Sequence, residues 1–125
     1  MSNQIETDDL FESINQGVPN TNCFGYVLYK LGVDDSDNDI SEFFSEKDEE
    51  RLFERVNSYD EADAIAVLNY SKTLPHIHMV YIDKEKNRLL HKINFGLPVK
   101  VTSMEELEVI YPRDTYIYVF LKLKR

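Results

Sequence analysis

The chain has 125 residues, of which 42% are hydrophobic and 30% charged, and its net charge is −9 at neutral pH. This length and composition predict one globular domain over residues 1–125 and exclude collagen-like, low-complexity and largely disordered chains. The single cysteine excludes a disulfide framework and a multi-thiolate zinc site, and the negative charge argues against a nucleic-acid partner.

The charge is divided unevenly along the chain. Residues 1–62 carry 16 acidic and 4 basic side chains, whereas residues 63–125 carry 7 acidic and 10 basic ones. We interpret this as an acidic helical half followed by a nearly neutral strand half. No apolar run approaches the ~20 residues that a membrane-spanning helix needs. The polar, acidic N-terminus is unlike a secretory signal, so we expect a cytoplasmic protein without a membrane partner.

Two helices are predicted in the first third of the chain. Residues 5–14 predict a short helix that ends at Gly17, with Pro19 preventing its continuation. The clearer signal is an apolar stripe with i, i+3, i+4, i+7 spacing at Phe24, Val27, Leu28 and Leu31. Residues 20–22 offer N-cap side chains and Gly32 suits the C-terminal stop. This helix therefore has Cys23 in its first turn.

The segment after this helix is acidic. Residues 33–39 contain aspartates at alternate positions, which suggests calcium ligands, but the central glycine and the final glutamate of an EF-hand loop are absent. We expect a solvated loop there. Residues 40–59 predict one long or two short helices, with Ser45 able to cap the second piece.

The second half of the chain predicts strands. Its β-branched and aromatic segments are residues 64–70, 76–83, 88–95, 99–102 and 115–123, and residues 103–109 read as a short helix that Ser103 caps. Helices followed by strands indicate an α+β fold in which N-terminal helices pack on a mostly antiparallel sheet of about five strands.

All three histidines lie in one predicted hairpin. If Asp83 and Arg88 close a four-residue turn, with Asn87 in the left-handed conformation, opposing residue numbers sum to 171. His78 and His91 then become diagonal neighbours on one face of the sheet. His76 has the same parity as His78 and is the competing candidate for the base.

These residue types suit nucleophilic catalysis. A thiolate attacks carbonyl carbon, and a helix N-terminus can lower the pKa of a cysteine and hold the oxyanion that forms. A histidine can take and return the proton while a second one fixes its tautomer. If Cys23 is such a nucleophile, we expect its pKa to lie well below the usual ~8.5.

Several segments resemble the NlpC/P60 cysteine peptidases. Asn22-Cys23-Phe24-Gly25-Tyr26 is similar to the Asp-Cys-Ser-Gly-Phe of their nucleophile helix, and residues 62–68 to the Gly-Asp-Leu-Val strand that follows it. Residues 76–82 resemble the His-Val-Gly-Ile-Tyr-Ile strand, and residues 89–91 the strand with the third catalytic residue. The resemblance runs from about residue 20 to the C-terminus in the order of the family.

The resemblance implies a compact papain-like fold and hydrolysis of an amide bond, or acyl transfer, with a peptide or amide substrate and no cofactor. It implies Cys23 as nucleophile, His78 (or His76) as base and His91 as the residue that orients the base. Gln16 is a candidate oxyanion donor, as a glutamine is in papain-like enzymes. Phe24 and Asn22 depart from the family pattern.

Three other interpretations stay open. Cys23 is an inert core thiol in the first, as free cysteines commonly are. His76, His78 and His91 bind a catalytic zinc ion in the second. The third is a catalytically silent papain-like module that recognises a peptide or protein, with the acidic segment 42–54 suited to a basic partner.

Overall fold

The computed structural model describes residues 22–33, 45–69, 76–92 and 99–124. The predicted helix over residues 5–14, the candidate Gln16 and the acidic residues 34–39 lie outside the described residues. In chain order the described elements are α2 (Cys23–Lys30), α3 (Glu46–Leu52), β1 (Phe53–Val56), the 3-10 helix η2 (Tyr59–Glu61), β2 (Ala64–Asn69), β3 (His76–Asp83), β4 (Arg88–His91), β5 (Lys100–Thr102), α4 (Met104–Ile110) and β6 (Tyr116–Leu123). No helix in these ranges has the length and apolar character needed to cross a membrane.

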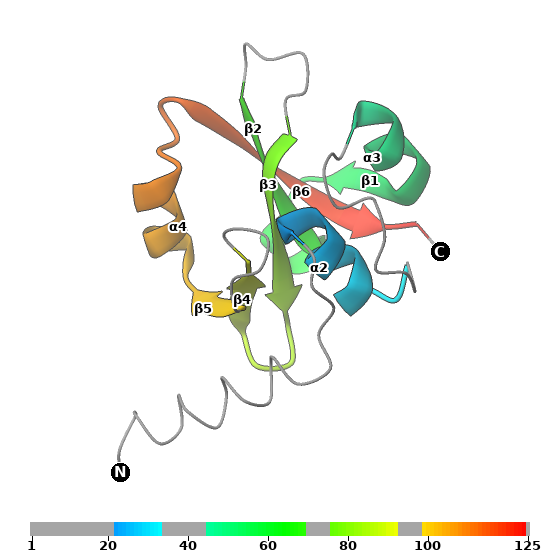
Figure 1. Cartoon of the computed structure of the whole chain (residues 1–125), viewed down its shortest axis with the longest axis horizontal. Helices are drawn as coiled ribbons and strands as arrows, with labels where there is room; N and C mark the ends of the chain where they lie inside the picture. The colour runs from blue at the N-terminus through cyan, green and yellow to red at the C-terminus, as the bar shows by residue number, and fades with distance from the viewer. Residues whose placement is uncertain (1–21, 34–44, 70–75, 93–98, 125) are drawn as a thin grey trace.

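The strands form one six-stranded sheet with the order β1-β6-β2-β3-β4-β5, and every neighbouring pair is antiparallel (Figure 1). The α+β class is thus confirmed, with six strands where we predicted about five. The last strand of the chain, β6, lies between β1 and β2, so the C-terminal segment joins the edge of the sheet to its centre.

Two apolar layers cover the two faces of the sheet. Helix α2 packs on the face formed by Ala64, Ala66, Leu68, Met79, Leu90 and Leu121. The opposite face, which carries Ile65, Val80, Ile82 and Leu89, packs against Leu107 of α4. We refer to these as the α2 face and the α4 face.

The predicted helix caps are present. Asn22 caps α2 by accepting a hydrogen bond from the Gly25 N–H at 3.0 Å, and Gly32 follows the helix with a positive φ of 72°. Ser45 begins α3 in a reciprocal capping box with Asp48, which satisfies N–H groups that the first turn leaves without partners. Ser103 caps α4 by accepting from the Glu106 N–H at 3.1 Å.

The prediction of helix through residue 59 is wrong. Helix α3 ends at Leu52, and the chain passes directly into β1, which pairs Phe53 with Leu123 and Val56 with Phe120. A short apolar run is compatible with the hydrophobic spacing of a helix and with that of a strand. Here residues 53–56 form a strand because they pair with the edge of β6.

The predicted hairpin is confirmed. Strands β3 and β4 pair Tyr81 with Leu90, Ile82 with Leu89 and Asp83 with Arg88, which is the register expected from a four-residue turn. Asn87 has a φ of 51°, the left-handed conformation that asparagine tolerates well.

Candidate functional site

Cys23 is the first residue of α2, and only 6% of its surface is exposed. Burial raises the pKa of its thiol to about 11, although backbone hydrogen bonds at Met79 and Phe24 act in the opposite direction. The expectation of a lowered pKa is therefore wrong for this structure, because desolvation outweighs the helix terminus. The backbone hydrogen bond with Met79 places the sulfur against β3, and Cys23 belongs to the apolar layer on the α2 face.

The imidazoles of His78 and His91 are hydrogen-bonded to each other. The Nε2 of His78 lies 2.8 Å from the Nδ1 of His91, and the two rings meet edge-on with centroids 5.0 Å apart. Only 1% of His78 and 2% of His91 is exposed. The diagonal contact expected from the hairpin register thus exists. If the His78 Nε2–H donates this bond, the Nδ1 of the neutral His78 ring keeps its lone pair and is a proton acceptor.

Both imidazoles are neutral at physiological pH. Burial, and after it the nearby His91, lowers the pKa of His78 to about 3. The pKa of His91 is lowered by burial and by Lys100, while Glu106 acts in the opposite direction. Because Cys23 is protonated as well, none of the three candidate catalytic residues carries a charge at rest.

Tyr111, which the sequence analysis did not single out, joins this group. Its ring stacks on His78 with centroids 5.1 Å apart and an interplanar angle of 25°. Burial, and after it the proximity of Cys23, raises the pKa of Tyr111 to about 12. One ring therefore contacts His78 and lies within electrostatic range of Cys23. The sequence signal was the helical spacing of Met104, Leu107 and Tyr111, which continues the buried stripe of α4 by one residue.

His76 belongs to a different group. Strands β2 and β3 pair Val67 with His78 but Leu68 with His76, because a β-bulge inserts Ile77 as an extra residue. Directly paired residues point to the same face, so His76 lies on the α2 face and His78 on the α4 face. The expectation that His76 and His78 share a face is thus wrong.

On the α2 face, the Nε2 of His76 lies 2.8 Å from the Oε1 of Glu49. Arg55 donates two further hydrogen bonds to that carboxylate, at 2.8 and 3.0 Å. Burial acts to raise the pKa of Glu49, but the bonds from Arg55 and His76 outweigh it and hold the pKa below its ordinary value. The three histidines therefore do not converge, and no group of three potential ligands that could hold a metal ion occurs among the described residues.

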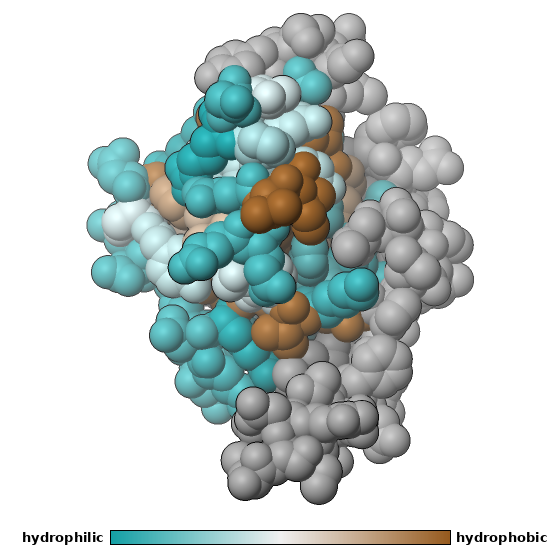
Figure 2. Space-filling model, turned by 90° about the vertical axis from the view of Figure 1, so that its left-hand side faces the viewer, coloured by the Kyte–Doolittle hydropathy of each residue, from teal (hydrophilic) through white to brown (hydrophobic). Residues whose placement is uncertain are grey.

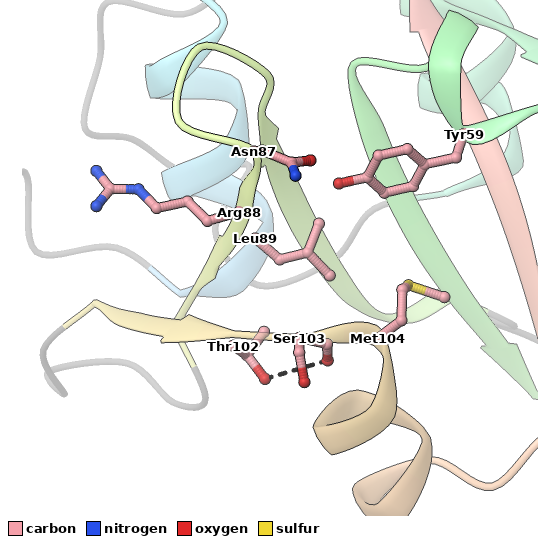
Figure 3. A pocket seen from close by; sticks show the side chains of 7 residues that line it. All are labelled: Tyr59, Asn87, Arg88, Leu89, Thr102, Ser103 and Met104. Carbon is pink, nitrogen blue, oxygen red and sulfur yellow. Dashed lines mark hydrogen bonds between the residues drawn. The ribbon is translucent and has the colours of Figure 1, made fainter.

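A hollow of about 220 Å³ opens on the surface beside β4 and the start of α4 (Figure 3). In Figure 3 the side chains of Asn87 and Tyr59 extend toward each other across it, and Leu89 and Met104 lie below them. Leu89 pairs with Thr102 and precedes His91 by two residues. Residues two apart on a strand share a face, so the hollow opens on the side of the sheet that holds the two histidines.

The comparisons with known proteins identify no relative. No protein-family profile, no curated protein and no solved structure matches this chain.

Proposed function

We propose that the protein is a small thiol hydrolase or acyl-transfer enzyme of the papain-like, NlpC/P60 type that acts on an amide bond. The observation that carries this proposal is the buried hydrogen bond between His78 and His91, because Tyr111, whose ring stacks on His78, lies within electrostatic range of Cys23 at the start of α2. A buried imidazole pair of this kind has a fixed tautomer, and the N-terminus of α2 at Cys23 supplies N–H groups for an oxyanion.

The proposed reaction begins with Cys23 in its thiol form. As the sulfur attacks the carbonyl carbon, an S–C bond forms and the thiol proton passes to the Nδ1 of His78. His91 orients the resulting His78 imidazolium, because its Nδ1 accepts the hydrogen bond from the Nε2–H of His78. The proton then moves to the leaving nitrogen as the C–N bond breaks, and water or an acceptor amine releases the acyl group from sulfur.

Neither Cys23 nor His78 is charged before substrate binds. A thiol with a pKa of about 11 and an imidazole with a pKa of about 3 do not form an ion pair in this structure. Proton transfer must therefore accompany the attack, and a bound substrate that stabilises the developing charge is required.

Acylation by an activated ester tests the proposal. The full-length protein is incubated with p-nitrophenyl acetate at pH 7.5, and the intact mass is followed together with a peptide map of Cys23. We expect one acetyl group on Cys23 in the wild type, none at this position in Cys23→Ser, and acylation at least tenfold slower in His78→Gln. His76→Gln is the matched control, because the imidazole of His76 is hydrogen-bonded to Glu49 whereas that of His78 is hydrogen-bonded to His91, and it should acylate at the wild-type rate.

The second candidate function is a catalytically silent binding module on the same fold. The observation that favours it is the burial of Cys23, since a thiol that is 6% exposed and holds its proton to pH about 11 is also what an inert core residue looks like. If wild-type Cys23 is not acylated in the folded protein, this function replaces the enzyme.

Such a module has a surface that could contact a partner. Val109 is 80% exposed and Ile110 48% exposed on α4, beside the acidic side chains of Glu105, Glu106 and Glu108. Figure 2, which shows this side of the molecule, has brown areas surrounded by teal. A partner with both apolar and basic side chains would complement such a surface.

A further inference from the structure

Tyr111 is held in place from both ends of its backbone. Its N–H donates to the carbonyl of Leu107 at 2.8 Å, and its carbonyl oxygen accepts a hydrogen bond from the Tyr118 hydroxyl at 2.7 Å. The ring itself lies between His78, on which it stacks, and Tyr116, whose ring meets it edge-on at 5.5 Å. Contacts from α4 and β6 thus fix a side chain whose flat face rests on His78 of β3.

We propose that Tyr111 is a positioning residue, whose ring fixes the orientation and tautomer of the His78 imidazole and keeps water from one face of it. This inference rests on the proposed function, since it assigns Tyr111 to the base of that reaction. It goes beyond it because neither the resemblance nor the spacing of the cysteine and histidines assigns a role to this residue.

The geometry explains why two contacts are needed. An imidazole on a strand can turn about two side-chain torsions, and a single hydrogen bond still permits rocking of the ring. His91 fixes one edge through Nε2, and the stacked ring of Tyr111 restricts tilting out of the ring plane. Together the two contacts leave Nδ1 as the ring nitrogen available for proton exchange with a thiol.

The phenol suits this position electrostatically. With a pKa of about 12 it stays uncharged over the whole range in which a histidine titrates, so it excludes water without placing an anion on the ring. The proposal assigns the effect to the aromatic ring and not to the hydroxyl.

The charged and titratable groups around the pair come from several elements. His91 of β4 and Tyr111 after α4 contact His78 directly. Lys100 of β5 and Glu106 of α4 act on His91, and Cys23 of α2 acts on Tyr111. A test of Tyr111 must therefore leave all of these groups unchanged.

The ring-nitrogen NMR spectrum of the two histidines provides the test. Long-range ¹⁵N–¹H correlations of the full-length protein at pH 7 report the tautomer of each ring, and a titration from pH 2 to 8 covers the His78 midpoint, which is at about 3 in the wild type. We expect a single tautomer for His78 in the wild type and in Tyr111→Phe. In Tyr111→Leu we expect a second tautomer and a titration midpoint that rises by ~1 unit or more, because water reaches the imidazole.

Two further variants keep the test decisive. Phe120→Leu removes an aromatic ring from the same face, on which it contacts Tyr59, and should leave the His78 tautomer unchanged. If Tyr111→Leu does not fold, Tyr118→Phe is used instead, because it removes only the hydrogen bond to the Tyr111 carbonyl. It should raise the His78 titration midpoint by a smaller amount. An unchanged His78 tautomer and midpoint in the folded Tyr111→Leu, or a change in Tyr111→Phe as large as in Tyr111→Leu, would overturn the proposal.

The result separates this inference from the proposed function. A tautomer change in Tyr111→Leu, with no acylation of wild-type Cys23, supports the positioning role and rejects the enzyme. Acylation of the wild type, with His78 unaffected by loss of the Tyr111 ring, supports the enzyme and rejects the positioning role.

Discussion

The thiol of Cys23 shows how opposing local effects are decided by magnitude. A helix terminus favours a nearby negative charge by about 0.3–1 kcal/mol at ordinary positions. The rise of the Cys23 pKa from 9.0 to about 11 corresponds to roughly 3 kcal/mol, and burial is its largest cause. Position on the helix could be read from the sequence, but burial depends on β3 packing against α2, which no local pattern reveals.

The raised pKa of Cys23 predicts a loss of stability at alkaline pH. The folded protein resists ionisation of this thiol until pH about 11, whereas the unfolded chain ionises near 9, so stability is complete below pH 9 and falls above it. By pH 10 the wild type should lose about 1.4 kcal/mol more unfolding free energy than Cys23→Ala, each relative to its own value at pH 7. Urea denaturation at the two pH values measures this, and parallel losses in both proteins would contradict it.

The lowered pKa of His78 predicts the opposite dependence in acid. Its contribution to stability is complete above the unfolded pKa of about 6.5 and is lost as pH falls toward 3. In this range His78 binds a proton in the unfolded chain but stays neutral in the folded protein, where it is buried. Wild-type stability should therefore fall by up to about 1.4 kcal/mol per pH unit more steeply than that of His78→Gln between pH 6 and 4. Urea denaturation across that range checks the difference in slope, and equal slopes would show that His78 does not titrate differently in the folded state.

At the level of elements, the sequence predicted what short-range chemistry controls. The asparagine and serine caps, the stop at Gly32 and the β3–β4 turn with Asn87 in the left-handed conformation were all predicted from adjacent residues. The contact between His78 and His91 followed from that turn alone. Strand β1 and the bulge at Ile77 were missed, because each depends on pairing with a strand distant in the sequence.

The bulge separates two polar groups, and this predicts a different phenotype for each. Glu49→Gln weakens the bonds to Arg55 and His76 that connect α3 and β1 to β3, so it should cost about 1–3 kcal/mol of unfolding free energy. The exposed Glu50→Gln on the same helix is the control and should stay within about 0.5 kcal/mol of the wild type. Urea denaturation measures both variants.

Acylation of Cys23 should be unaffected in the folded Glu49→Gln, since Glu49 contacts His76 and not His78. Acylation as slow in Glu49→Gln as in His78→Gln would instead identify His76 and Glu49 as the working pair.

On the scale of the whole molecule, β6 connects the two ends of the fold. It pairs with β1 on one side and β2 on the other, and Leu121 lies fully buried opposite both Arg55 and Ala64. The sequence predicted the α+β class and most strands, but the strand order depends on pairings across some sixty residues. Only the folded chain reveals that the acidic half supplies an edge strand to the sheet.

Because Leu121 of β6 is fully buried, we expect truncation of its side chain to lower the stability of the fold strongly. Leu121→Ala should lower the unfolding free energy by about 2–5 kcal/mol, because it leaves a cavity in the middle of the sheet. Val109→Ala removes two methyl groups from a side chain that is 80% exposed, and it should change stability by less than about 0.5 kcal/mol. Urea denaturation of the two variants compares these values, and similar losses would place β6 outside the core.

The most direct measurement of the central claim is the rate at which p-nitrophenyl acetate acylates Cys23 in the folded protein. The account predicts that the thiol reacts without denaturant, that His78→Gln slows the reaction about tenfold or more, and that His76→Gln leaves it within about twofold. A thiol that reacts only after unfolding, or at one rate in all three proteins, would contradict the assignment of Cys23 and His78 to one site.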